Sequence, residues 1–251
     1  RNGLIAFGSS LDQVGPFSKN VEDCEILYNT IKGYDSNDLT SLNNFSEIEI
    51  KNINELKIGI CDELTGDGIS DEVQRHFENS IKELKNLGAK VENVSVPFIK
   101  ESLPVYYLTA PSEASSNLNR YDGIKYGLSD NKHPNSWEVI KNTRSNFGEE
   151  VKRRILLGTF ALSSGYYDEY YGKAQKVRGM IVHSFKEVFK EYDILISPTS
   201  PITAFDFGAM IDDPITMYQN DICTMPANIA GIPAISIPCG MSDGLPVGLQ
   251  I

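Results

Sequence analysis

One segment constrains the fold more than any other, an amphipathic helix between two short apolar strands. Between residues 70 and 88 the apolar side chains recur at spacings of three and four, the period of a helix with one buried face; they are Val73, Phe77, Ile81, Leu84 and Leu87. Ser70 is a typical residue to begin such a helix, and Gly88 a typical one to end it. Residues 56–61 and 91–96 are apolar enough to form strands on either side, so the segment predicts a β-α-β unit.

The remaining chain continues the alternation of helices and strands. Ser18 is expected to cap a helix that Gly33 ends, and residues 216–230 read as one short helix. Further apolar strands are expected at residues 194–196, 234–238 and 245–251. The pattern predicts an α/β fold class.

A long central segment differs from the two ends of the chain. Residues 97–190 are expected to be mainly helical, with interruptions near Gly158 and Gly165. We therefore predict a single, partial domain over residues 1–251. Its α/β core spans about 1–96 and 191–251, and a helical insertion spans about 97–190.

Charge and hydropathy exclude several function classes. The longest apolar run, residues 155–162, is far shorter than the roughly 20 residues of a membrane span, so no membrane contact is expected. A net charge of −11 would repel phosphate backbones, which argues against a broad nucleic-acid surface. The four cysteines form no C-x-x-C pair and are expected to be reduced and partly buried, as in a cytoplasmic protein. The first residue is Arg rather than Met, so the chain is interpreted as a fragment.

Common catalytic and metal-binding motifs are missing from the sequence. It contains no phosphate-binding glycine loop, no G-x-S-x-G turn and no metal-type spacing of Cys and His. His76, His133 and His183 are far apart and are interpreted as ordinary helix or surface residues. Ser129 and Lys132 match S-x-x-K, but in a polar loop without the companion motifs, so the match is interpreted as coincidence.

Several residues stand out because their polar groups occur in apolar surroundings. Arg153 and Arg154 precede an apolar helical run and cannot both face solvent. Asp221 lies in a largely uncharged segment, and the adjacent Tyr106 and Tyr107 lie in an apolar run. An Arg, an Asp and a Tyr in one pocket would suit a zwitterionic amino acid, with the guanidinium on its carboxylate and the other two on its ammonium. From spacing alone, ordinary ion pairs and helix faces are the simpler explanation of the same residues.

Aromatic residues are concentrated in residues 151–189. Tyr166 and Tyr170, and likewise Tyr167 and Tyr171, are four residues apart, so their rings should meet along a helix. Packing against the α/β core is the simpler explanation, and a surface for a partner protein is the alternative.

Several longer strings of the sequence are distinctive; they are RNGLIAF, SSLDQVGP, SEASSNL, EVKRRI, LGTFALS, GYYD, KAQKVR and AGIP. These strings resemble the amidase signature superfamily and, within it, the family of A subunits of the glutamyl-tRNA(Gln) amidotransferase. The resemblance covers essentially the whole chain.

This resemblance implies a fold and a site. The fold would be part of an amidase-signature fold, a mixed β-sheet flanked by helices with a helical insertion. The glutamine pocket of the family would fall on Tyr106, Arg154 and Asp221. The family's serine–cis-serine–lysine catalytic set would lie upstream of the match to Arg1, so no catalytic residue, cofactor or metal is expected in this chain, and the chain alone is expected to be inactive. Ser9 and Ser10 do not match the catalytic serines.

The resemblance also implies partners. Ammonia from glutamine would pass to a B subunit that activates Glu-tRNA(Gln) with ATP and magnesium, in a cytoplasmic heterotrimer that includes a C subunit. The tRNA would then be met indirectly, through the B subunit, which agrees with the acidic charge of this chain. Two alternatives stay open: a fragment of a free-standing amidase that acts on a small amide, and a non-catalytic α/β binding module.

Overall fold

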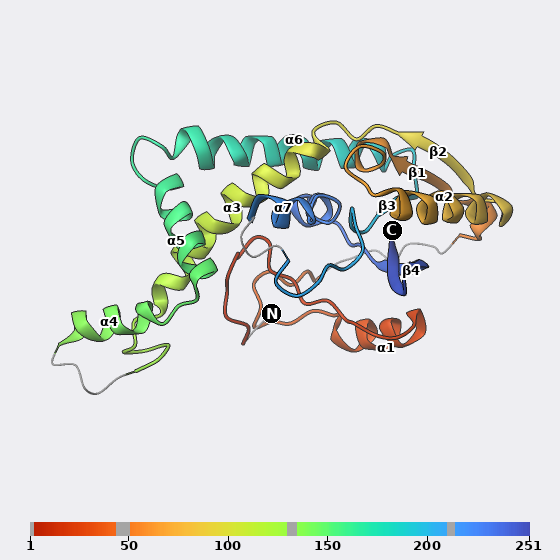
Figure 1. Cartoon of the computed structure of the whole chain (residues 1–251). Coiled ribbons are helices and arrows are strands. Elements are labelled where there is room, and N and C mark those ends of the chain that lie inside the picture. The colour runs from red at the N-terminus through yellow and green to blue at the C-terminus, as the bar shows by residue number, and fades with distance from the viewer. Residues whose placement is uncertain (1–2, 44–50, 130–134, 210–213) are drawn as a thin grey trace. The chain divides into compact units, whose positions relative to one another are not determined.

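A computed structural model describes residues 3–43, 51–129, 135–209 and 214–251. Within these residues the strands form one five-stranded mixed sheet in the order β2-β1-β3-β5-β4 (Figure 1). The strands are β1 (Lys57–Cys61), β2 (Lys90–Val94), β3 (Ile194–Pro198), β4 (Ser236–Ser242) and β5 (Leu245–Gln250). The predicted α/β class and the mixed sheet are confirmed.

The predicted β-α-β unit is present. Helix α2 (Asp71–Asn86) begins where Ser70 Oγ accepts the backbone N–H of Val73, at 3.4 Å. It lies along the sheet (Figure 1) and contacts β2, β3, β4 and β5. β1 and β2 pair in parallel. Leu87 is exposed, contrary to the prediction that it shares the buried face, because the helix ends before it.

The second half of the sheet reverses direction. β3 runs parallel to β1, whereas β5 runs antiparallel to β3 and to β4. Asp243 and Gly244 both have positive φ, which is the backbone of the tight Asp-Gly hairpin turn between β4 and β5. The core of the sheet consists of Ile58, Ile60, Phe77, Ala89, Val91, Ile196 and Leu249.

The described elements between β2 and β3 are all helical. They include α3 (Ser102–Asn117), α4 (Ser136–Ser145), α5 (Glu149–Ala161), a π-helical turn (Asp168–Gly172) and α6 (Lys173–Val188). Helix α5 continues through Gly158, so the predicted interruption there is wrong. The break comes after Ala161 and includes Gly165, whose φ is +93°.

Two other helix predictions need correction. Residues 216–230 form two helices, α7 (Pro214–Gln219) and α8 (Met225–Ala230), because the N–H groups of residues 220–222 donate to carbonyls three residues back rather than four. Helix α1 (Val21–Ile31) is capped by Asn20 rather than Ser18: Asn20 Oδ1 accepts the N–H of Asp23, at 2.7 Å. No residue of α1 is buried, although its apolar residues recur on one face.

The chain divides into two compact units. The first comprises residues 1–15, 35–40 and 104–176, and the second comprises residues 16–34, 41–103 and 177–251. The sheet belongs to the second unit. The prediction of a single domain with an insertion at about 97–190 stays a prediction.

No helix in the described part of the chain is both long enough and apolar enough to span a bilayer.

Candidate substrate-binding site

The first unit holds Arg154 on one face of α5. The Nε of Arg154 donates to Oε1 of Glu150 at 2.8 Å, one helical turn earlier. The Arg154 side chain is 22% exposed, against 48% for Arg153, which also pairs with Glu150 through its Nη1. The structure thus separates the two arginines as the sequence suggested, with Arg154 the more enclosed.

Tyr106, from α3, reaches the same guanidinium. The side chains of Tyr106 and Arg154 are hydrogen-bonded, and because a guanidinium only donates, the phenolic oxygen of Tyr106 accepts. Burial lowers the pKa of Arg154, but the hydrogen bond to Glu150 and the neighbouring Tyr106 outweigh this effect, so the pKa is raised. Arg154 therefore stays charged while its side chain is largely enclosed.

The ring of Phe7 packs near the same group. Its centroid lies 5.8 Å from Cζ of Arg154, within the range of a cation–π contact. The backbone of Phe7 is fixed at both ends: its N–H donates to Asp12 Oδ2 at 2.8 Å, and its carbonyl accepts from Asn117 Nδ2 at 2.9 Å. Phe7, Tyr106, Glu150 and Arg154 form what we call the Arg154 site.

Asp221, the third predicted pocket residue, belongs to the second unit. It lies in the turn between α7 and α8 and is partly buried. Its carbonyl accepts the N–H groups of Thr224 and Met225, at 3.1 and 3.0 Å. The structure brings Tyr106 and Arg154 together within one unit and describes Asp221 with the other.

The hydroxyl groups of Ser9 and Ser10 contact α3. Ser10 Oγ donates to Glu113 Oε1 at 2.6 Å, and Ser9 Oγ accepts from Asn117 Nδ2 at 2.8 Å. Both hydroxyls thereby hold the N-terminal segment to α3.

Two of the cysteines are poor nucleophiles. All four are free thiols. Burial, with smaller effects of Glu63 and Asp62, raises the pKa of Cys61 to about 12, and burial raises that of Cys223 to about 12. These two remain protonated near neutral pH, and a thiol is a far weaker nucleophile than a thiolate.

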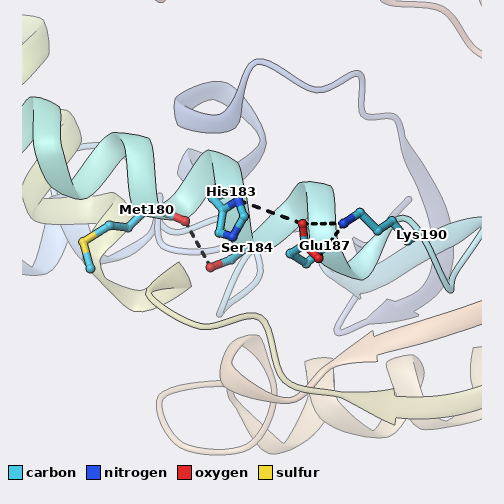
Figure 2. A network of polar contacts seen from close by, with 5 residues as sticks. All are labelled: Met180, His183, Ser184, Glu187 and Lys190. Carbon is cyan, nitrogen blue, oxygen red and sulfur yellow. Dashed lines mark hydrogen bonds and ion pairs between the residues drawn. The ribbon is translucent and has the colours of Figure 1, made fainter.

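A serine, a histidine and a carboxylate do occur together on α6, and they form a surface network (Figure 2). His183 Nδ1 lies 4.0 Å from Glu187 Oε1, which also accepts from Lys190 Nζ at 2.7 Å. Ser184 Oγ donates to the carbonyl of Met180 at 3.1 Å, so its proton is not directed at His183. His183 is an exposed helix residue, as predicted, and the group is not a catalytic triad.

The other two histidines are His76 and His133. His76 lies on α2, and its ring occupies the space where a side chain on Gly240 of β4 would be. His133 lies outside the described residues, as does Lys132 of the S-x-x-K match.

The tyrosine pairs meet as their spacing predicted. The ring centroids of Tyr166 and Tyr170 are 6.0 Å apart, and those of Tyr167 and Tyr171 are 5.4 Å apart. Tyr166 and Tyr167 are exposed, whereas Tyr170 and Tyr171 are partly buried.

The second unit contains a cavity of about 410 Å³. It lies between the loop after β3 and the β4–β5 hairpin, and its lining includes Val73, Thr199, Ile202, Asn220, Ser236 and Val247. Thr199 Oγ1 and Ser236 Oγ are hydrogen-bonded across it at 2.7 Å. These groups offer hydroxyl and apolar contacts but no charge for a carboxylate, unlike the Arg154 site.

The chain belongs to the amidase family, whose profile matches residues 1–251. Among characterised relatives it is similar to the A subunit of the glutamyl-tRNA(Gln) amidotransferase from Staphylococcus aureus (strain bovine RF122 / ET3-1), with 52% identity over 255 residues. That match covers 100% of this chain and 53% of the relative. The protein of the same name from Thermoanaerobacter pseudethanolicus is also 52% identical, over 256 residues that cover 100% of this chain and 52% of the relative.

Solved structures agree with these relatives. The crystal structure of the corresponding A subunit from Thermotoga maritima has a TM-score of 0.76 and 46% identity, covering 99% of this chain and 50% of that one. A crystal structure of an amidase, with a TM-score of 0.70 and 19% identity over 98% of this chain and 49% of its own, shares the fold. The chain spans about half the length of the relatives it matches.

Sequence reasoning missed two members of the Arg154 site. Glu150 lies four residues before Arg154 on a predicted helix, a spacing at which opposite charges pair. That signal was available in the sequence. Phe7 gave no such signal, because its contact with Arg154 depends on the path of the N-terminal segment.

Proposed function

We propose that this chain supplies the glutamine-binding part of a glutaminase subunit, which provides ammonia for the conversion of Glu-tRNA(Gln) to Gln-tRNA(Gln). The names and 52% identity of its relatives support this function. The observation that carries it is the Arg154 guanidinium, enclosed but charged, hydrogen-bonded to Tyr106 and Glu150. A charged and oriented guanidinium is the group that recognises the carboxylate of an amino acid.

The contacts of Tyr106 refine its proposed role. Because its oxygen accepts from Arg154, its O–H is the group that can donate further, and a substrate carboxylate is a suitable acceptor. The sequence analysis had assigned Tyr106 to the ammonium. We now propose that Tyr106 and Arg154 bind the carboxylate together, and that Asp221 binds the ammonium.

Hydrolysis of the side-chain amide needs a nucleophile. We propose that a serine–cis-serine–lysine set supplies it from the part of the relatives' length that this chain does not span. An acyl-enzyme would form with release of ammonia, and water would then release glutamate. ATP and magnesium would act at a partner B subunit, which would also hold the tRNA, in a complex completed by a C subunit. We place the complex in the cytoplasm, which the four free cysteines support.

The alternative of a free-standing amidase fits the Arg154 site less well. A small neutral amide carries no charge for the Nη end of Arg154, although Glu150, which pairs with its Nε, is shared with Arg153 and leaves one positive charge unbalanced among the three side chains. The third alternative, a non-catalytic binding module, differs from both in predicting no amide hydrolysis by the full-length protein.

The test is glutamine turnover by the full-length protein, both alone and assembled with its candidate B and C subunits. We expect the three to copurify, and Glu-tRNA(Gln) with ATP to raise the rate of ammonia release. Such coupling between sites is typically worth 1–3 kcal/mol, or about 5- to 150-fold. A protein that stays monomeric and hydrolyses simple amides equally well with or without its candidate partners would favour the free-standing amidase. No hydrolysis of any amide would favour the binding module.

A further inference from the structure

Glu150 contacts both arginines of the KRR sequence on α5. Its Oε1 accepts from Nε of Arg154, and its Oε2 accepts from Nη1 of Arg153. Each carboxylate oxygen is therefore occupied by a different guanidinium. Glu149, one residue earlier, pairs with Lys152 at 2.9 Å and is 86% exposed, so the two neighbouring acids have separate roles.

The contact with Glu150 determines which edge of Arg154 faces a ligand. A guanidinium is planar and has five N–H donors, and the single donor on Nε is the one that Glu150 takes. The Phe7 ring lies near the group, and Tyr106 accepts one more hydrogen bond. The plane of the guanidinium is thereby fixed, and its Nη groups are left as the end that can bind a carboxylate through two parallel hydrogen bonds.

The charges of Glu150, Arg153 and Arg154 also favour the binding of a carboxylate by Arg154. Glu150 alone beside Arg154 would neutralise it and repel an incoming carboxylate. With Arg153 on its other oxygen, the three side chains carry one net positive charge, which one substrate carboxylate balances. Arg153 is the more exposed of the two arginines, so water and salt weaken its contribution.

We propose that Glu150 is a positioning residue of the Arg154 site, which orients the guanidinium so that its Nη edge receives the α-carboxylate of glutamine. This inference rests on the proposed function. Glu150 acts through Arg154 and need not touch the substrate, so its removal should weaken the binding of the carboxylate while the chemistry at the distant amide continues.

The test compares Glu150→Gln with the matched variant Glu149→Gln in the full-length protein, assembled with its partners and supplied with Glu-tRNA(Gln) and ATP. The carboxylate clamp acts equally in the bound substrate and the transition state, so its loss appears in KM. We expect Glu150→Gln to raise KM for glutamine by about 5- to 30-fold, with kcat within about twofold of the parent. This is less than the roughly 10- to 150-fold loss of one whole charge-assisted hydrogen bond, because Arg154 itself remains. Glu149→Gln should leave both constants at the parent values.

A ligand without the carboxylate separates positioning from a general loss of structure. 4-Aminobutanamide is glutamine without its α-carboxylate, and its inhibition constant against glutamine hydrolysis should be equal in the parent and in Glu150→Gln. An inhibition constant that rises as much as KM, or a KM that rises equally in both variants, would overturn the assignment, as would an unchanged KM in Glu150→Gln. A parent complex that does not hydrolyse glutamine would instead refute the proposed function, and the inference with it.

Discussion

Gly158 of α5 lies directly against the backbone of Pro111 in α3, so closely that a Cβ on Gly158 would overlap the carbonyl group of Pro111. The two helices can approach to this distance because one of them carries no side chain at the contact. α3 provides Tyr106 and α5 provides Arg154, so the separation of these two helices also sets the geometry of the Arg154 site.

Replacing Gly158 with Ala should therefore destabilise the protein. In an exposed helix, Ala is more favourable than Gly by about 1 kcal/mol. At Gly158 the added methyl group forces α3 and α5 apart, and overpacking of this kind costs about 1–3 kcal/mol. We expect a lower thermal unfolding midpoint together with weaker glutamine binding.

Gly179 provides the control for this substitution. It lies inside α6 with nothing within 4 Å of the position of its Cβ. Gly179→Ala should raise the unfolding midpoint slightly, by the helix-propensity gain of up to about 1 kcal/mol. Equal stability of the two alanine variants would mean that the contact between α3 and α5 is looser than described.

Arg154 should matter far more for glutamine hydrolysis than its neighbour Arg153. Arg154→Ala removes two charge-assisted hydrogen bonds to the substrate carboxylate, worth about 1.5–3 kcal/mol each and not fully additive. We expect kcat/KM of the full-length enzyme to fall by about 10²- to 10³-fold, that is, roughly 3–4 kcal/mol. Arg153→Ala should cost much less, since that side chain is more exposed and pairs with Glu150. If both variants are folded, equal losses of kcat/KM in Arg154→Ala and Arg153→Ala would contradict the assignment of Arg154 to the substrate carboxylate.

Tyr106 and Tyr107 allow a second comparison of adjacent residues. Their rings meet edge to face with centroids 5.0 Å apart, but Tyr106 is the one that hydrogen-bonds Arg154. Tyr106→Phe keeps the ring and removes the hydroxyl, so we expect a rise of about 10- to 150-fold in KM for glutamine, the size of one hydrogen bond to a charged group. Tyr107→Phe should have a smaller effect, and steady-state kinetics on the two variants decides which tyrosine serves the pocket.

The sequence predicted the elements whose residues repeat regularly. The α2 helix and the strands β1, β2 and β3 were found because burial on one face forces a period of 3.6 or an unbroken apolar run. The turn that divides α7 from α8 was missed because it depends on backbone hydrogen bonds that reach three residues back rather than four, which leave no periodic trace. Gly158 was interpreted as a helix break because glycine has a low helix propensity, whereas its position is explained by a contact with another helix.

The candidate site was also predictable only in part from the sequence. Arg154 attracted attention because a charged residue precedes an apolar run. The contribution of Phe7 depends on contacts between segments far apart in the chain. A single sequence contains no local pattern that reports such contacts.

The last prediction concerns Asp193, which joins the beginnings of β1 and β3. Its Oδ2 accepts the backbone N–H of Lys57 at 2.9 Å, and its Oδ1 pairs with Lys51. The hydrogen bond from Lys51, followed by that from the Lys57 backbone, lowers the pKa of Asp193. A carboxylate whose pKa is lower in the folded state stabilises that state above the unfolded pKa of about 3.9 and loses this effect as the pH falls through the folded pKa.

Asp193→Asn should therefore reduce stability at pH 7, by about 1 kcal/mol or less because the side chain is partly exposed. The difference from the parent should shrink steadily as the pH is lowered below about 4, where the parent loses the same interaction by protonation. Urea unfolding from pH 7 to pH 3 measures this difference. Glu191→Gln is the control, because Glu191 is 74% exposed and lies 3.9 Å from Lys57 Nζ, so its removal should change little. A difference between Asp193→Asn and the parent that stays constant across this pH range would show that the loss is one of packing rather than of charge.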